Sequence, residues 1–172
     1  MTIDTNSALT ELLDREKIKA IAPRFARGLD RCDREIIESC FHPDGIDDHG
    51  FFRGSAAEFC DWVMGQLTRF SATQHMIASQ SIEQNGSRAV CESYFVAVHI
   101  IPNPEGDKEL TVAGRYVDEV EKRDDEWKIT LRTCIFDWNR MTDAATAPSP
   151  EGRDIGQQNR DDVSYALFDA IK

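Results

Sequence analysis

The chain has 172 residues, of which 41% are hydrophobic and 30% charged, and it carries a net charge of −11 at pH 7. This length and hydrophobic content predict one globular domain with a core of its own. Nucleic acids and anionic membranes attract clustered Lys and Arg, so the acidic balance argues against both and favours a neutral or apolar small molecule as partner. No stretch has the pattern of a signal peptide or a membrane-spanning helix, which predicts a cytoplasmic protein.

The first third of the chain has the pattern of helices. Apolar residues recur at the helical period over residues 7–29, and Pro23 predicts a kink or a division of this helix near Ala22. Asp33 has the character of an N-cap for a short helix that ends at residue 40. The sequence HPDG at residues 42–45 then predicts a turn.

A short strand and a further helix are expected next. Residues 46–52 have the composition of a strand, which Arg53 and Gly54 interrupt. Ser55 and Glu58 form a capping box, which is a specific signal for the start of a helix. The apolar face of that helix predicts an end near residue 71.

After residue 71 the apolar residues alternate with a period of two. Four strands are predicted, with turns between them at 85–86, 102–107 and 124–125, and they cover residues 73–84, 87–101, 109–123 and 126–139. Short connections of this kind join antiparallel neighbours, so we expect an α+β fold in which N-terminal helices pack on a mainly antiparallel sheet.

The strand at 87–101 is apolar on both alternating sets of side chains, so both faces of the sheet need a cover. We expect the helices to cover one face and a second subunit the other, which predicts a homo-oligomer, a dimer or trimer. Residues 1–142 are predicted to form the single domain. Residues 143–172 have the composition of a linker followed by a short apolar patch, and we expect them to form a C-terminal extension or arm.

Asp30 and His75 are the first candidates for chemistry. Asp30 follows Gly28 and Leu29 at the end of an apolar helix face, where it is placed to point inward, and His75 lies early in a strand that would face this helix. A carboxylate bonded to one ring nitrogen fixes the tautomer of an imidazole and leaves the other nitrogen as a general base. The alternative is that His75 is an ordinary core or surface histidine.

Three further residues on the strands are candidates for substrate contacts. His99 lies on the same face as Phe95, and would be a second polar group in an apolar cavity, unless it reaches solvent at the end of the sheet. Arg132 would need a carboxylate or an anionic ligand if it faced inward. The strand pattern itself favours the outward position beside Glu119 or Glu121.

The sequence contains no established motif for a metal site or for nucleotide binding. The histidines and carboxylates between His42 and His49 have the right donor types for a metal but no established ligand spacing, so a solvated acidic turn is the preferred interpretation. The five cysteines lack a Cys-x-x-Cys pair and are expected to be reduced. No glycine-rich phosphate loop or serine nucleophile motif is present. We therefore predict no metal and no cofactor.

The chain nevertheless resembles a known superfamily. The resemblance is carried by FARGLDRCDREIIESCFHPDGIDDHGFFRG, TQHMIASQSI and GRYVDEVEKRDDEWKITLRTCIFDW, in that order. Together they are similar to the SnoaL-like branch of the nuclear-transport-factor-2-like superfamily, which includes scytalone dehydratase, bile-acid dehydratase and hexachlorocyclohexane dehydrochlorinase. The resemblance implies a cystatin-like cone, in which helices pack into a strongly curved sheet around an apolar pocket.

The resemblance also implies site residues. Asp30 and His75 fall on the Asp–His dyad of those elimination enzymes, His99 on a second pocket histidine and Arg132 on a pocket arginine. His49 falls where scytalone dehydratase has a water-holding tyrosine. Leu29 replaces a second tyrosine of that enzyme, which argues against its specific activity.

The implied activity is a cofactor-independent dehydratase or dehydrohalogenase reaction on a small, largely apolar cyclic substrate. His75, oriented by Asp30, would abstract a proton, while His99, His49 or Arg132 would stabilise negative charge or assist the leaving group. Phe95 would contact the substrate. Two alternatives stay open: a non-catalytic binding or assembly module, such as the small subunit of ring-hydroxylating dioxygenases, and an isomerase or polyketide-cyclase-type enzyme.

Overall fold

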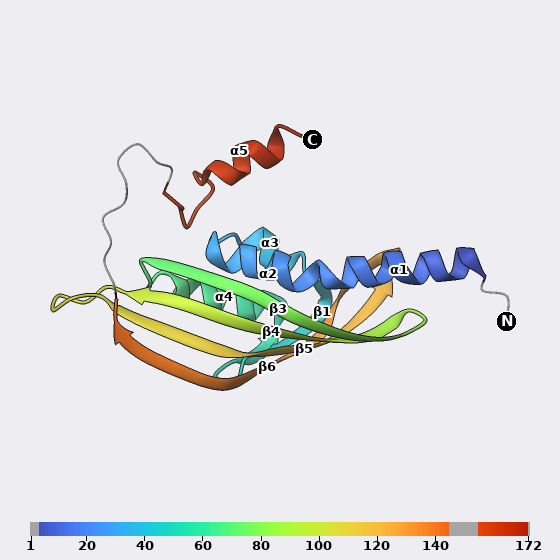
Figure 1. The fold of residues 1–172 in the computed structure, drawn as a ribbon, viewed down its shortest axis with the longest axis horizontal. Helices are drawn as coiled ribbons and strands as arrows, with labels where there is room; N and C mark the ends of the chain where they lie inside the picture. Colours follow the sequence, from blue (N-terminus) through green and yellow to red (C-terminus); the bar gives the residue numbers. More distant parts are fainter. Residues whose placement is uncertain (1–3, 145–154, 172) are drawn as a thin grey trace.

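The computed structural model describes residues 4–144 and 155–171. Four helices precede or interrupt the strands, and a fifth follows them: α1 (Thr5–Lys19), α2 (Ile21–Asp30), α3 (Arg34–Glu38), α4 (Ala56–Leu67) and α5 (Val163–Asp169). The strands are β1 (Phe41–Asp48), β2 (Arg53–Ser55), β3 (Ala72–Asn85), β4 (Arg88–Ile101), β5 (Lys108–Arg123) and β6 (Glu126–Asp143). Helices α2, α3 and α4 lie over one face of a single curved sheet (Figure 1). This is the predicted α+β class.

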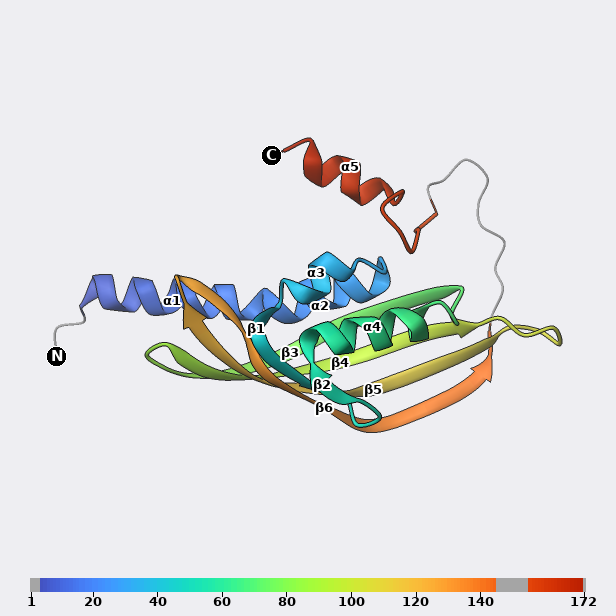
Figure 2. The same ribbon diagram turned by 180° about the vertical axis from the view of Figure 1, so that it is seen from behind.

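The sheet has the strand order β2-β1-β6-β5-β4-β3. Strands β3 to β6 form the predicted antiparallel meander, each paired with its neighbour in the chain. Strand β1 pairs parallel with β6, which was not predicted, and Asp47 is the register partner of Arg132. A parallel pair needs a long crossover, here helix α4 and the four strands β2 to β5, and no local pattern reports it. Figure 2 shows β1 and β2 at the edge of the sheet beside α4.

The break in the first helix lies at Ala20, three residues before Pro23. Pro23 is the third residue of α2, where a backbone N–H has no partner within the helix, so proline fits there without a kink. The prediction of a break near Ala22 was therefore slightly misplaced. Asp33 caps α3 as predicted, because its side chain accepts a hydrogen bond from the Ile36 backbone N–H.

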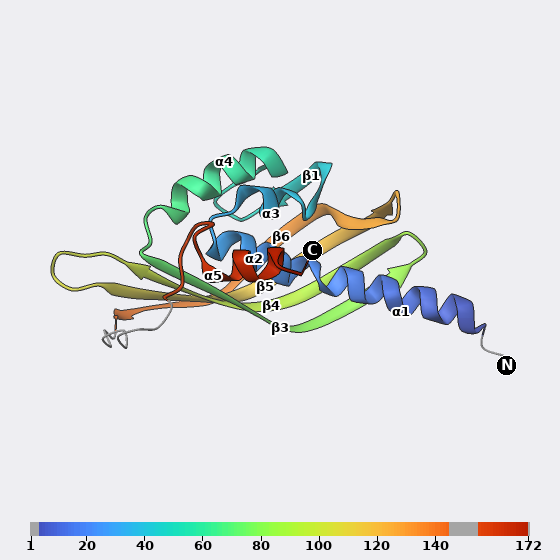
Figure 3. The same ribbon diagram turned by 90° about the horizontal axis from the view of Figure 1, so that it is seen from above.

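The N-terminal half of α1 extends beyond the sheet (Figure 3). Leu9, Leu12 and Leu13, which the helical pattern assigned to a buried face, are each more than half exposed. Ile18, in the last turn of α1, is buried in the core. Only the C-terminal end of this helix therefore contributes to the core of the chain.

Residues 42–45 do not form the predicted turn, because they belong to strand β1. The pairing of β1 with β6 shifts register between Phe41 and Ile46, so the Pro–Asp–Gly segment is accommodated as an irregularity within the strand. Arg53 and Gly54 do not end a strand either, since they form β2. The chain turns back between β1 and β2, which pair antiparallel.

The capping box at the start of α4 is present as predicted. Ser55 Oγ accepts from the Glu58 backbone N–H, and a Glu58 carboxylate oxygen accepts from the Ser55 backbone N–H at 2.8 Å. Helix α4 ends at Leu67, earlier than the predicted residue 71. Phe59 and Cys60 from this helix are completely buried against the sheet.

The side chains of strand β4 differ in burial between the two faces of the sheet. Cys91 and Phe95 are buried under the helices, whereas Val90 and Tyr94 on the other face are nearly half exposed. This partly exposed apolar face is where a second subunit was expected, and the homo-oligomer stays a prediction. None of the helices within residues 4–144 and 155–171 is long and apolar enough to cross a membrane.

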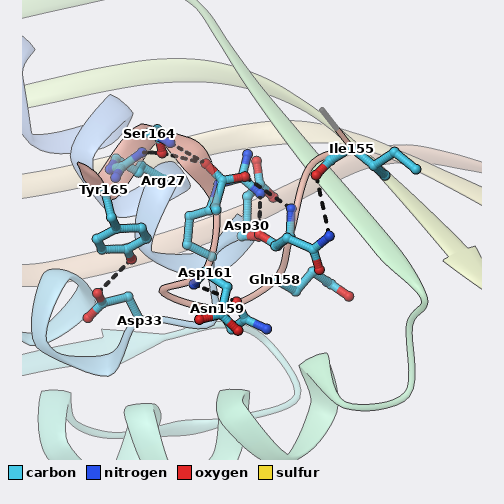
Figure 4. Close-up of polar contacts among 12 residues, drawn as sticks. Arg27, Asp30, Asp33, Ile155, Gln158, Asn159, Asp161, Ser164 and Tyr165 are labelled. Carbon is cyan, nitrogen blue, oxygen red and sulfur yellow. Dashed lines mark hydrogen bonds and ion pairs between the residues drawn. The ribbon is translucent and has the colours of Figure 1, made fainter. Parts of the chain in front are cut away.

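The C-terminal segment returns to the helical face of the molecule, where α5 lies above α2 and α3 (Figures 1 and 3). Tyr165 donates a hydrogen bond to Asp33 at 2.6 Å, and Arg27 donates to Ser164 at 3.0 Å (Figure 4). The Gln158 amide lies 3.4 Å from the hydroxyl of Thr73. Strand β6 runs to Asp143, and the predicted division into residues 1–142 and 143–172 stays a prediction.

Candidate active site

A cavity of about 210 Å³ lies between the helices and the inner side of the sheet. Its lining is mainly apolar and aromatic, and it includes three histidines, His49, His75 and His99, together with Gln66. The apolar lining residues are Leu29, Phe51, Trp62, Val63, Leu67, Phe70, Phe95, Ala97, Leu110, Val112, Tyr116 and Phe136. An apolar pocket with a few convergent polar groups is the usual form of a small-molecule site.

Asp30 and His75 meet in this structure. Asp30 is the last residue of α2, and His75 lies near the start of β3, against which α2 packs. The Asp30 Oδ1 atom is 2.7 Å from Nδ1 of His75, and both side chains are nearly buried. Two residues that are far apart in the sequence are therefore joined by a short hydrogen bond at the edge of the cavity.

The Asp30 carboxylate is held by three donors. Besides the His75 ring, it accepts from the His75 backbone N–H at 2.9 Å and from the Thr73 hydroxyl at 3.0 Å. Thr73 and His75 are two residues apart in a strand, so both project toward the same side of the sheet and reach the same carboxylate. Hydrogen bonds of this kind stabilise the ionised form of a carboxylate.

The carboxylate decides the tautomer of His75. An ionised Asp30 accepts the Nδ1 proton, which leaves Nε2 of the neutral ring with its lone pair. Within the described residues, no hydrogen bond is made to this Nε2 atom. His75 lines the cavity, so the arrangement can place a general base beside a bound molecule.

His99 lies next to His75, as its place on β4 predicted. The two rings meet edge to face with their centroids 5.4 Å apart, and the His99 ring packs on Phe70. Burial, together with the neighbouring His75, lowers the pKa of His99 to about 4. His99 is therefore a neutral imidazole near pH 7, and its buried Nδ1 has no partner among the residues that the structure describes.

His49 lines the same cavity from the end of β1. Its Nδ1 atom is 2.9 Å from Oδ1 of Asp47, a residue that is completely buried. The His49 ring stacks on Phe59 with a centroid distance of 5.0 Å. The structure thus contains a second Asp–His pair that was not predicted from the sequence, although the spacing of two at the end of β1 places both side chains on one face.

Arg132 does not reach the cavity. It is completely buried, and its Nε and Nη2 atoms donate to the two carboxylate oxygens of Asp118 at 2.7 and 2.6 Å. Its guanidinium lies 4.0 Å from the ring centre of Phe25 and 4.2 Å from that of Tyr116. The expected pocket arginine is therefore corrected to a structural ion pair behind the cavity wall. The outward position beside Glu119 or Glu121 is also wrong, because its register partner on β5 is Asp118.

Phe95 contacts the cavity, as expected. Its ring stacks on Tyr116, a fully buried cavity residue, with a centroid distance of 4.4 Å. The remaining cavity aromatics, including Trp62 and Phe136, come from α4 and β6, and the sequence offered no signal that would distinguish them from ordinary core residues.

The residues from His42 to His49 do not form the solvated turn that was preferred. His42 is buried and its Nε2 lies 2.8 Å from the Glu121 carbonyl oxygen, while Asp44 pairs with Arg123 at the surface. No group of three or more His, Cys, Asp or Glu in the described residues is arranged to hold a metal.

All five cysteines are free thiols, and burial raises the pKa of Cys60 to about 12.

A larger hollow of about 660 Å³ lies elsewhere, around the β3–β4 turn and β5. Its lining includes charged residues such as Glu83, Arg88 and Glu119, and it contains no histidine. The candidate active site is therefore the smaller apolar cavity, which His49 and His75 both line.

Comparison with known protein families gives one match. The model of the family described as "SnoaL-like domain" matches residues 10–133, which include every cavity histidine and both Asp–His pairs. Comparison with curated proteins gives no match.

Several solved structures share this fold. A hexachlorocyclohexane dehydrochlorinase, LinA-type3 from Novosphingobium barchaimii, superimposes with a TM-score of 0.72 at 17% identity, covering 83% of this chain and 99% of that one. A protein assigned by name as a scytalone dehydratase, from Novosphingobium aromaticivorans, gives 0.68 at 23% identity, covering 85% and 98%. The Kfla4162 protein of Kribbella flavida gives 0.70 at 18% identity, covering 76% and 95%. At these identities the likeness shows the fold alone.

Proposed function

Because the chain belongs to the SnoaL-like domain family, we propose that it is a cofactor-independent lyase that eliminates water or a halide from a small, largely apolar cyclic substrate. The observation that carries the proposal is the 2.7 Å contact between Asp30 and His75 at the wall of an apolar cavity. Structural neighbours named as a dehydratase and a dehydrochlorinase support the same reaction class.

The reaction begins with proton abstraction. Nε2 of His75 takes a proton from a carbon that a neighbouring carbonyl or leaving group has made acidic, and the ring becomes an imidazolium. Asp30 stabilises that charge through the hydrogen bond at Nδ1. The electron pair of the C–H bond forms the new double bond as the β-substituent leaves.

The cavity restricts the substrate. Its volume of about 210 Å³ is below the roughly 300 Å³ at which pockets for drug-sized ligands begin, so a compact molecule of one or two rings fits best. Phe95, Tyr116 and Phe70 present ring faces or edges rather than charges. Exclusion of water by such walls strengthens each electrostatic interaction of the dyad.

The test is a product assay on hydroxylated and halogenated cyclic ketones, with the alkene and the released group both measured. We expect His75→Gln and Asp30→Asn to lower kcat/KM by about 10²–10⁴-fold, the usual contribution of a positioned general base, while circular dichroism and melting temperature stay near wild type. His42→Gln is the matched control, because His42 is buried against the Glu121 carbonyl outside the cavity.

The same assay separates the alternatives. A product with a moved double bond and a retained substituent would favour an isomerase, and activity that needs Asp30 but not His75 would favour a cyclase-type catalyst. Full activity in the His75 variant would remove the dyad from the mechanism. Binding of the ketones without turnover would favour a binding module.

A further inference from the structure

The cavity holds a second acid–base pair besides Asp30 and His75. We propose that the Asp47–His49 pair is the acid of the reaction and protonates the leaving group while His75 removes the proton. The inference rests on the proposed elimination and assigns the second half of it to a residue pair of its own.

The geometry of the pair matches that of the first. Nδ1 of His49 lies 2.9 Å from Asp47 Oδ1, so the other ring nitrogen, Nε2, is the one available to a ligand. No hydrogen bond to that Nε2 is made by any residue that the structure describes. The side chain is 14% exposed and lines the cavity, whereas Asp47 behind it is wholly buried.

The ring is also held in place by aromatic contacts. It stacks on Phe59 and meets Phe136 edge to face, with centroid distances of 5.0 and 6.1 Å. Trp62 and Tyr116 lie at 6.3 and 6.1 Å. A ring fixed on several sides presents its free nitrogen in one direction, as proton transfer to a bound molecule requires.

Buried charges lie behind the Asp47–His49 pair. Asp47, Arg132 and Asp118 are aligned across three adjacent strands by the register of β1 with β6 and of β6 with β5, and all three are buried. Two carboxylates and one guanidinium leave one negative charge in excess. An imidazolium at His49 would balance it, because buried charges are tolerated when they are paired.

Two unsatisfied atoms support this reading. Asp47 Oδ2 and Arg132 Nη1 are both buried and without a hydrogen-bond partner among the described residues. The Asp118 carboxylate takes the donors at Nε and Nη2 of the guanidinium, and Nη1 makes no hydrogen bond to Asp47. Asp47 therefore keeps acceptor capacity that an imidazolium would stabilise.

The other histidines are less suited to this role. His75 is occupied by the general-base function, and burial lowers the pKa of His99 to about 4, so near neutral pH His99 lacks the acidic proton of an imidazolium. His49 is the one cavity histidine of the described chain that has its own carboxylate and is free for an acid function.

The two pairs complete a balanced elimination. The C–H bond breaks and its proton goes to Nε2 of His75, the electron pair forms the C=C bond, and the C–O bond breaks as the leaving oxygen takes the Nε2 proton of His49. The products are an alkene and water, with His75 protonated and His49 neutral. Exchange with solvent restores the starting charges. A halide leaves as a stable anion and needs no such proton.

This difference between leaving groups supplies the test. Two substrates with the same ring, one with a β-hydroxyl and one with a β-chloride, are compared in the wild type and in His49→Gln, which preserves a polar group of similar size. We expect kcat/KM to fall by about 10²-fold or more for the alcohol, within the range for acid catalysis, and by less than about threefold for the chloride. His75→Gln should slow both equally.

Asp47→Asn tests the charge of the pair. The amide oxygen can still accept from Nδ1, so the ring stays oriented while the negative charge is lost, and we expect the same selective loss for the alcohol. Asp48→Asn is the matched control, because Asp48 is the next residue and pairs with Arg53 at the surface. Equal losses for both substrates in the His49 variant would overturn the assignment.

A spectroscopic readout keeps the inference separate from the proposed function. The acid role requires a proton on Nε2 of His49, and nitrogen NMR of the histidine rings tests for it: we expect this proton in the wild type and its loss in Asp47→Asn. A neutral wild-type ring would overturn the acid role even if elimination is observed. Absence of turnover with both substrates would overturn the proposed elimination, and with it the acid role, whatever charge the ring carries.

Discussion

The two Asp–His pairs of the cavity are built in opposite ways. Asp30 and His75 come from a helix end and a strand, and tertiary packing alone brings them together. Asp47 and His49 are two residues apart at the end of β1, so a short extended stretch of chain places them on one face. The fold is needed to bring Asp30 into contact with His75. For Asp47 and His49 the fold instead supplies the buried charges around them.

The groups that surround the two Asp–His pairs also differ. The carboxylate of the first pair is satisfied by three neutral donors, including Thr73, and a neutral His99 lies beside its imidazole. The carboxylate of the second pair has one unpartnered oxygen and lies in line with the buried Arg132. Neutral surroundings suit His75, a base that starts as a neutral imidazole. An excess of negative charge suits His49, an acid that starts as an imidazolium.

Removal of Arg132 should have the largest effect on stability. Arg132→Met leaves Asp118 and Asp47 buried without a cation, and breaking a buried ion pair in this way costs about 3–5 kcal/mol. Urea denaturation measures the loss, and the NMR signals of His49 should shift more than those of His75. Arg123→Met, at an exposed ion pair on the neighbouring strand, is the control and should cost far less. Similar stability of the two variants would show that the buried charges of Arg132, Asp118 and Asp47 do not depend on one another.

The pH dependence of stability should report on His99, beside the first pair. Its pKa is about 4 in the folded protein and 6.5 in the unfolded chain, so the unfolded state binds more protons between these values. Stability should therefore fall as the pH is lowered from 6.5 to 4, by at most about 3 kcal/mol. Melting curves of wild type and His99→Gln across this range measure the difference. Parallel pH profiles would show that His99 is not the group responsible.

The smallest effect is expected from Thr73→Val, which keeps the shape of the side chain. It removes one of the three donors of Asp30 and should cost about 1 kcal/mol, with a modest loss of kcat. Thr130→Val, which removes a hydroxyl bonded to the Glu119 carbonyl outside the cavity, serves as control for stability. A loss of kcat as large in the control would mean that Thr73 does not position the carboxylate.

The four long strands were predictable because alternation is a local signal. Each of them was placed to within a few residues, and the short turns between them specified antiparallel neighbours. The capping box at Ser55 and the cap at Asp33 were also recognised, since both depend on side chains within three residues of a helix start.

The wrong predictions concern residues whose structure is determined by partners distant in the sequence. Strand β1 contains Pro43 and Gly45, which suggest a turn until β6 supplies a parallel neighbour. The strand pattern favoured the surface for Arg132 and the family resemblance placed it in the pocket, and both predictions missed its partner Asp118, which is defined by strand register. Asp30 and His75 were paired as one of two alternatives from the helix and strand pattern, and the family resemblance favoured the pairing, whereas Asp47 was overlooked in an apparently acidic turn.

The parallel pairing of β1 with β6 has a consequence for the order of folding. Helix α2 and strand β3 can meet once the first half of the chain is available, so the contact of Asp30 with His75 does not need the last strand. Asp47 must wait for Arg132, near the end of the sheet, before its charge is buried beside a cation. Because pairings between distant segments form slowly, we expect the base to be assembled early and the acid to gain its working environment last.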